Sequence, residues 1–149
     1  MAGRDFCITI DIAAPPERVW AVMSDVERWH EWTASITRIE RLDSGPLAVG
    51  NRARIWQPKL LPAMWKVTAL DPGRSFIWKS GSAVAWTSGH HSVAAIEHGS
   101  RATLALHFGG PLGGRVARLL SGLNNRYLQM EAAGLKRRSE ELSKQANRA

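Results

Sequence analysis

The side chains best suited to acid–base chemistry are histidines, and two of the five are adjacent. Imidazole titrates near neutral pH, so a histidine in a pocket can act as a general base or bind a ligand oxygen. His90 and His91 lie in a strand-like segment, where neighbouring side chains point to opposite faces of a sheet. One of them should therefore face the interior, and the pattern leaves open which. The same alternation prevents the pair from chelating one ion, so we expect no metal site and no cofactor.

Motifs for nucleophilic catalysis or phosphate binding do not appear. Ser88 and Ser92 flank the histidine pair, but there is no GxSxG motif around them. The glycine-rich segment 109–114 lacks the Lys and the Ser or Thr of a phosphate-binding loop. The single cysteine, Cys7, is expected to be a buried, inert thiol. The sequence therefore identifies no catalytic residue.

An apolar stripe near the C-terminus predicts the element that covers such an interior. Apolar residues recur at spacings of three and four between Leu112 and Lys144, which predicts one long, uninterrupted helix. Its inward face is expected to carry the following side chains: Leu119, Leu123, Tyr127 and Met130.

Short segments with period-two alternation precede this helix and predict seven strands. They cover about residues 6–12, 36–42, 51–57, 63–70, 75–79, 85–96 and 101–108, with a bulge expected near Gly89. Two short helices are expected after the first strand, one from Pro16 and one from Asp25. Ser24 and Glu27 have the spacing of a capping box for the second of them.

Three tryptophans in these short helices, Trp20, Trp29 and Trp32, are expected to close one end of the sheet as structural residues. Runs of strands followed by a helix indicate an α+β fold rather than alternating βα units. We expect a single domain over residues 1–149.

A curved antiparallel sheet closed by one long helix leaves space between the two layers. The side chains expected to line that space are Gln57, Trp65, Trp86, His90 or His91, Leu104, Leu106, Phe108, Leu119, Leu123, Tyr127 and Met130. Such a wall predicts a site for an apolar or aromatic small molecule. The alternative is a fully packed core without a ligand.

The formal net charge of +7 raises the question of an anionic partner. Between Arg115 and Arg148 the sequence has eight Lys or Arg residues and three Glu. A basic helix can meet nucleic acid or anionic lipid, but no nucleic-acid motif accompanies the charge. We therefore expect a solubilising face and no specific nucleic-acid partner.

No run of residues approaches the ~18 apolar positions of a transmembrane helix. Asp5 and Asp11 lie where an export signal would be apolar, so we expect a cytoplasmic protein. The oligomeric state is not predicted.

Several segments resemble one known superfamily. They are IDIAAPPERVWAVMSDVERWHEW, AVGNRARIWQP, WKVTALDPGRSFIW, GSRATLAL, and GGPLGG followed by a helix with RYLQMEAAGLKRR. Together they span about Asp5 to Glu141 and resemble the polyketide cyclase/dehydrase and lipid-transport superfamily, also called START, Bet v 1-like or SRPBCC. The resemblance implies a helix-grip fold, in which a seven-stranded antiparallel sheet wraps around the C-terminal helix and encloses a deep cavity.

The superfamily contains carriers, cyclases, hydrolases and regulatory receptors, so three functions stay open. The first is binding of a lipid- or polyketide-like molecule without chemistry. The second is a polyketide cyclase or aromatase in which His90 or His91, with Tyr127, moves protons. The third is a regulatory partner-binding protein, like the quinone-binding and toxin-like relatives, that uses its basic helix.

Overall fold

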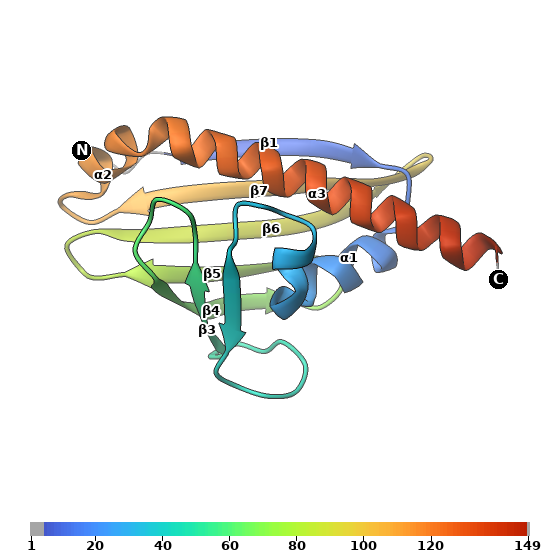
Figure 1. Cartoon of the computed structure of the whole chain (residues 1–149), viewed down its shortest axis with the longest axis horizontal. Helices are drawn as coiled ribbons and strands as arrows, with labels where there is room; N and C mark the ends of the chain where they lie inside the picture. Colours follow the sequence, from blue (N-terminus) through green and yellow to red (C-terminus); the bar gives the residue numbers. More distant parts are fainter. Residues whose placement is uncertain (1–4, 149) are drawn as a thin grey trace.

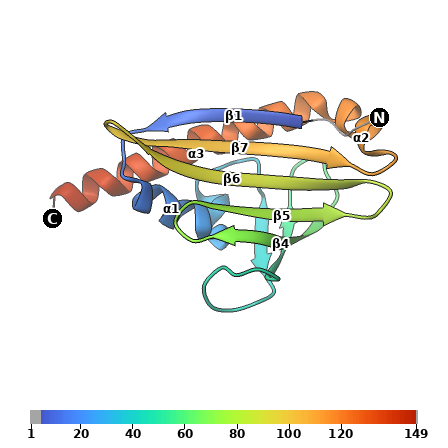
Figure 2. The same cartoon turned by 180° about the vertical axis from the view of Figure 1, so that it is seen from behind.

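Seven antiparallel strands form one sheet in the computed structural model, which describes residues 5–148. The strands are β1 (Asp5–Ile12), β2 (Arg38–Arg41), β3 (Arg52–Trp56), β4 (Ala63–Asp71), β5 (Ser75–Gly81), β6 (Trp86–Ile96) and β7 (Gly99–Gly109). Their order in the sheet is β1-β7-β6-β5-β4-β3-β2 (Figures 1 and 2). All seven predicted strands are present, and the helix-grip fold is confirmed. Residues 1–4, on which part of the expectation about an export signal rests, lie outside the described residues.

The first strand shows how alternation builds the core. Ile8, Ile10 and Ile12 lie on the inner face of the sheet, while Asp5 and Cys7 lie on the outer face. β1 pairs with β7, and Ile12 is opposite Ser100. The expected burial of Cys7 is wrong, because its thiol is exposed on this outer face.

The sheet irregularity lies in a different strand from the one expected. The register shifts between Val67 and Ala69 of β4, and β6 pairs without interruption through Gly89. The glycine has a packing reason, since a Cβ at position 89 would lie 3.0 Å from the indole of Trp78. The expected bulge near Gly89 is therefore wrong.

Two short helices follow β1, as expected. α1 (Pro16–Ser24) begins with a proline in its first turn, and the 3₁₀ helix η1 (Val26–Glu31) follows it. The expected capping box is absent, because the Ser24 hydroxyl donates to the Trp20 carbonyl instead. Trp29 and Trp32 are buried with ring centroids 5.7 Å apart, which agrees with a structural role.

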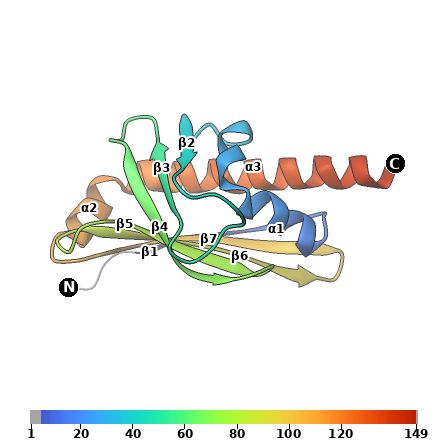
Figure 3. The ribbon, with the colours of Figure 1, turned by 90° about the horizontal axis from the view of Figure 1, so that it is seen from below.

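The C-terminal helix is divided in two. α2 (Gly113–Leu119) and α3 (Ser121–Arg148) are separated at Leu120, where φ is −101° and ψ is 10°. The expectation of an uninterrupted helix is therefore wrong at this point. The Ser121-Gly122 pair follows the break, and such pairs favour helix kinks. α3 crosses the inner face of the sheet and extends beyond it (Figure 3). Within residues 5–148, no helix combines the length and apolar character that a bilayer crossing requires.

A close backbone contact holds α3 against the segment after η1. A Cβ at Gly134 would lie 2.1 Å from the Trp32 carbonyl oxygen, so only glycine lets the helix approach this far. The same carbonyl accepts a hydrogen bond from Arg137 Nη2 at 2.9 Å. The neighbouring Leu135 is 1% exposed, and this part of the helix is therefore firmly packed.

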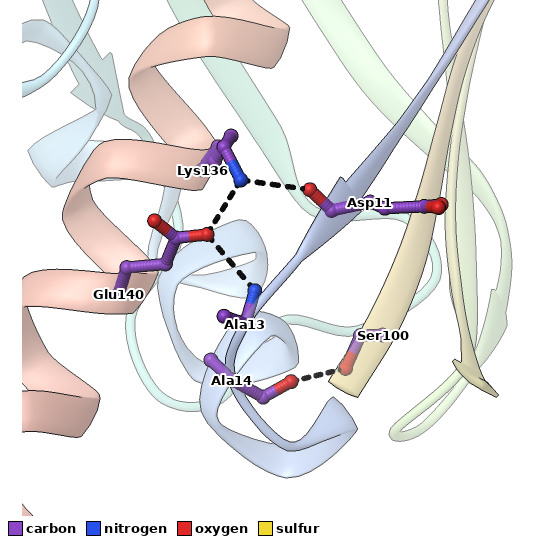
Figure 4. A network of polar contacts seen from close by, with 6 residues as sticks. All are labelled: Asp11, Ala13, Ala14, Ser100, Lys136 and Glu140. Atoms are coloured by element: carbon purple, nitrogen blue, oxygen red, sulfur yellow. Dashed lines mark hydrogen bonds and ion pairs between the residues drawn. The ribbon is translucent and has the colours of Figure 1, made fainter. Parts of the chain in front are cut away.

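A polar network fixes the same half of α3 to the end of β1 (Figure 4). Lys136 Nζ donates to the Asp11 carbonyl at 3.0 Å and pairs with Glu140 Oε2 at 2.6 Å. Glu140 Oε2 also accepts a hydrogen bond from the Ala13 amide at 2.9 Å. The Lys136 and Glu140 side chains thus link the helix to the turn between β1 and α1.

We expect Gly134→Ala to lower the melting temperature. Alanine usually stabilises a helix by about 1 kcal/mol relative to glycine, but here its methyl group would overlap the Trp32 carbonyl. Gly122→Ala is the matched control, because nothing lies within 4 Å of a Cβ at that helical position. Thermal unfolding followed by circular dichroism should show a clear loss for Gly134→Ala only. Equal melting temperatures of the two variants would contradict the close contact.

Candidate ligand cavity

A cavity of about 430 Å³ lies between the inner face of the sheet and the helices. Its volume falls within the ~300–1,000 Å³ typical of small-molecule sites. The sheet, η1 and the β3–β4 loop contribute mainly apolar and aromatic side chains, which include Trp29, Ile55, Leu60, Leu61, Trp65, Trp78, His91, Leu104, Leu106 and Phe108. The helices contribute Val116, Leu120, Asn124, Tyr127, Leu128 and Glu131.

Most of the residues that the sequence placed in the cavity border it in the structure. These are Gln57, Trp65, His90, His91, Leu104, Leu106, Phe108 and Tyr127. The structure does not bring four others to the wall, namely Trp86, Leu119, Leu123 and Met130.

Trp86 lies on the outer face of the sheet. Its ring sits beneath the Lys79 ammonium, 4.2 Å from the ring centroid, and covers Gly109, where a Cβ would overlap the indole. Trp86 shares a strand face with Ser88 and His90, and that face points away from the helices. Its expected place in the cavity is therefore wrong.

The helix residues were assigned to the wrong stripe. The wall uses Val116, Leu120, Asn124 and Tyr127, which follow one another at spacings of four, four and three. Leu119 lies on the next stripe and is 84% exposed, so its expected place is wrong. Leu123 and Met130 are half-buried and also lie outside the wall. Apolar residues occupy both stripes of the helix, so periodicity does not show which stripe faces the cavity. The prediction took the stripe that has more leucines.

His91 is the inward member of the histidine pair. Its ring stacks on Phe76 with centroids 4.4 Å apart, and the rings of Trp29 and Trp78 lie at 5.1 Å and 5.7 Å. Burial lowers the pKa of His91 to about 3, so the imidazole is neutral at neutral pH. Its Nδ1 is buried and has no hydrogen-bond partner.

His90 borders the cavity, but its imidazole belongs to the outer face. Its Nε2 lies 3.1 Å from Ser88 Oγ, and its ring meets His107 edge to face at 4.4 Å. His107 in turn bonds Asp5 through Nδ1 at 2.5 Å. Partial burial and the nearby His107 lower the pKa of His90. Within the described residues, no three His, Cys, Asp or Glu side chains converge to hold a metal ion.

Glu131 is a titratable cavity residue that sequence reasoning missed, as it also missed Asn124. Among the described residues its carboxyl group has no hydrogen-bond or ion-pair partner, and burial raises its pKa to about 8. The group is therefore mostly protonated at neutral pH and can donate a hydrogen bond. Helical spacing could have found it once one wall residue was known. Glu131 lies seven residues, about two helical turns, after the wall residue Asn124 and therefore on the same face of α3.

The polar groups of the cavity fall into two sets. Gln57 Nε2 donates to the Ser35 carbonyl at 3.2 Å, and the Tyr127 hydroxyl donates to the Pro58 carbonyl. These two side chains hold the loop after β3 in place. Trp65 Nε1 and Asn124 Nδ2 are buried without a partner, as is Nδ1 of His91. Unpartnered buried polar atoms are uncommon and call for a ligand, water or other explanation.

Comparison with known proteins agrees with this architecture. The family model described as "Polyketide cyclase / dehydrase and lipid transport" matches residues 5–140. No curated protein sequence is detectably similar to the chain.

Several solved structures share the fold. The Zhui aromatase/cyclase from Streptomyces sp. R1128 has a TM-score of 0.74 at 18% identity, over 92% of this chain and 93% of that one. TTHA0849 from Thermus thermophilus has a TM-score of 0.75 at 19% identity, over 94% and 99% of the two chains. The protein Ara h 8.0201 has a TM-score of 0.63 at 14% identity, over 89% and 97%.

The carboxyl group of Glu131 predicts a pH dependence of stability. Its pKa rises from 4.5 in the unfolded chain to about 8 in the fold, so only the folded state holds the proton between these values. Stability should therefore fall as pH rises through this window, and because Glu131 is only half-buried, about 5 kcal/mol is the upper bound on the loss. His91 acts in the opposite direction below pH 6.5, because its lowered pKa makes protonation favour the unfolded chain.

Glu131→Gln should remove the alkaline decline and be more stable than the wild type at pH 8.5. Glutamine has nearly the shape of the protonated acid and does not ionise. Urea unfolding at pH 6.5, 7.5 and 8.5 measures the effect. Glu141→Gln is the matched control on the exposed side of α3 and should keep the wild-type slope. If both variants keep that slope, Glu131 is not desolvated in the fold.

Proposed function

The chain belongs to the polyketide cyclase / dehydrase and lipid transport family, and on this premise we propose that it binds an apolar or aromatic molecule bearing hydrogen-bond acceptors in its cavity. The observation that carries this proposal is the combination of aromatic walls with unpartnered polar groups. This combination favours a flat, oxygenated ligand over a plain hydrocarbon. A cytoplasmic location stays a prediction from the sequence.

The walls suit a flat ring system. Trp65 and Trp78 lie with centroids 5.7 Å apart on neighbouring strands, and Phe108 borders the cavity from β7. Aromatic pairs contribute about 0.5–1.5 kcal/mol beyond the burial of their area. A ligand with fused rings would therefore gain more here than an aliphatic chain of the same volume.

The unpartnered groups suit oxygen acceptors. Trp65 Nε1–H and Asn124 Nδ2–H₂ are donors only, and the protonated Glu131 adds a third donor. A buried polar group left without a partner costs about 1–3 kcal/mol. The nitrogens of Trp65 and Asn124 are covered in this structure, so a small rotation of either side chain would let a ligand carbonyl or hydroxyl accept such a hydrogen bond and recover part of this cost.

A cyclase or aromatase is the second candidate, and one observation favours it. His91 and Glu131 both border the cavity, and burial shifts their pKa values in opposite directions. At neutral pH the first is an unprotonated base and the second a protonated acid, which is the pattern of an acid–base pair. The fold shared with the Zhui aromatase/cyclase supports the same candidate.

The regulatory candidate is less well supported. A continuous, exposed basic stripe on the C-terminal helix would favour it, and three cations of that helix are engaged in contacts with the rest of the fold. In α3, Lys136 pairs with Glu140, Arg138 pairs with Glu31, and Arg137 donates to the Trp32 carbonyl. These cations hold the helix to the rest of the fold.

Ligand selectivity tests the binding proposal. We expect the wild type to bind 1,4-naphthoquinone about tenfold more tightly than naphthalene, the difference expected from about one hydrogen bond. Asn124→Leu should reduce this ratio, because it removes a donor at the wall. Asn125→Leu is the matched control, since Asn125 is exposed and lies outside the wall. Quenching of tryptophan fluorescence measures both affinities. Equal ratios in the two variants would contradict the role of Asn124.

Turnover separates the two candidates. If the protein is a binder, a poly-β-ketone substrate should bind and should cyclise no faster, and to no different products, than in buffer without the protein. Cyclisation that His91→Leu or Glu131→Gln abolishes, while naphthoquinone still binds, would replace the binding proposal with the cyclase. Product analysis by mass spectrometry and ultraviolet absorbance distinguishes the outcomes.

A further inference from the structure

Four large, exposed apolar side chains lie on or beside segments that contribute to the cavity wall. Leu61 is 88% exposed, Leu119 84%, Val84 51% and Leu112 42%. They come from the β3–β4 loop, the β5–β6 loop and α2, which lie at the same end of the molecule (Figures 1 and 3). Single exposed leucines are ordinary, whereas a group of them around one opening indicates an interaction surface. We call these four residues the entrance rim.

The segments that carry the rim lie next to residues of the cavity wall. Leu61 belongs to the cavity wall even though it is largely exposed. The Leu112 amide donates to the Val84 carbonyl at 3.0 Å, so these two rim residues are neighbours. Leu119 directly precedes the wall residue Leu120 and lies two helical turns after Leu112. The apolar stripe of α2 therefore continues from the cavity onto the surface.

The charged residues on the three segments that carry the rim are all positive. Arg115 and Arg118 are exposed on α2, which has no acidic residue in its first turn, and Lys59 borders the cavity from the β3–β4 loop. None of these three cations forms an ion pair among the described residues. The entrance therefore combines protruding aliphatic groups with free positive charge.

We propose that the entrance rim docks on an anionic lipid surface, so that the ligand passes between the bilayer and the cavity without crossing water. This inference rests on the proposed binding function. The leucines enter the acyl boundary, and Arg115, Arg118 and Lys59 contact lipid phosphates, as in amphipathic segments that lie in a membrane interface. Because no described helix is suited to cross a bilayer, the attachment is peripheral and reversible.

Other occupants fit the rim less well. A second copy of the chain would bring Arg115 and Arg118 of both molecules together, and like charges repel. Single-stranded nucleic acid is bound by proteins through aromatic platforms, and the rim consists of leucine and valine. Charge and side-chain type together select anionic lipid.

Vesicle co-sedimentation tests the docking surface. The wild type should bind vesicles of phosphatidylcholine mixed with phosphatidylglycerol, bind pure phosphatidylcholine weakly, and lose affinity as salt is raised. Each charge removed near an anionic surface weakens binding about fivefold, so the reversal in Arg118→Glu should cost roughly twentyfold. Leu119→Ser should weaken binding severalfold. Both residues lie outside the cavity wall, so naphthoquinone binding without vesicles should be unchanged.

The chain offers matched controls away from the entrance. Lys66→Glu makes the same charge change on the outer face of β4, and Val49→Ser removes an exposed apolar residue from the β2–β3 loop. Both should retain wild-type vesicle binding. The proposal is wrong if the wild type does not bind anionic vesicles, or if the controls lose as much affinity for them as the rim variants. It is also wrong if size-exclusion chromatography shows that Leu119→Ser dissociates an oligomer. A wild type that binds naphthoquinone but not anionic vesicles counts against docking alone, whereas a wild type that binds no naphthoquinone counts against the proposed function.

Discussion

The contact between α3 and the Trp32 carbonyl determines how the inner face of the sheet is filled. Gly134 lets the helix backbone approach this carbonyl, and Arg137 donates a hydrogen bond to it. At this end Trp29, Trp32 and Phe76 are buried between the helices and the sheet. Towards the start of α3, no comparable set of side chains fills the gap, and the cavity occupies it. Core and cavity are thus two parts of one inner face, divided by where the large side chains are placed.

The strands and their number could be predicted because apolar and polar residues alternate along a half-buried strand, and the apolar ones face inward. The helix phase could not, since leucines occupy both the cavity-facing stripe and its neighbour, as Leu120 and Leu119 show. Asn124 and Glu131 were missed for a related reason. Polar residues in a basic helix read as a solvated face, and only the tertiary position of α3 turns them inward.

The histidine pair shows a second property that the local sequence pattern cannot predict. Alternation alone establishes that one ring faces in, but the choice depends on the pairing of β5 with β6. That pairing sets His91 opposite Phe76, whose fully buried ring stacks on the imidazole. His90 is turned to Ser88 and His107 by the same register. The pairing of β5 with β6 therefore gives the two adjacent histidines different environments. The hydrophobic pattern of the sequence is compatible with this pairing but does not specify it.

The pairing of β1 with β7 has a consequence for the order in which the chain can fold. Ile12 pairs with Ser100, so the first strand made during synthesis must wait for the last one before its backbone is satisfied. Until then Ile8 and Ile10 have no completed inner face to cover them, and α3, which anchors the end of β1 through Lys136, is made later still. Hairpins from β2 to β7 join strands that are close in sequence and can form first. Non-local closure of this kind slows folding and prolongs the exposure of β1 as an unpaired, isoleucine-rich strand.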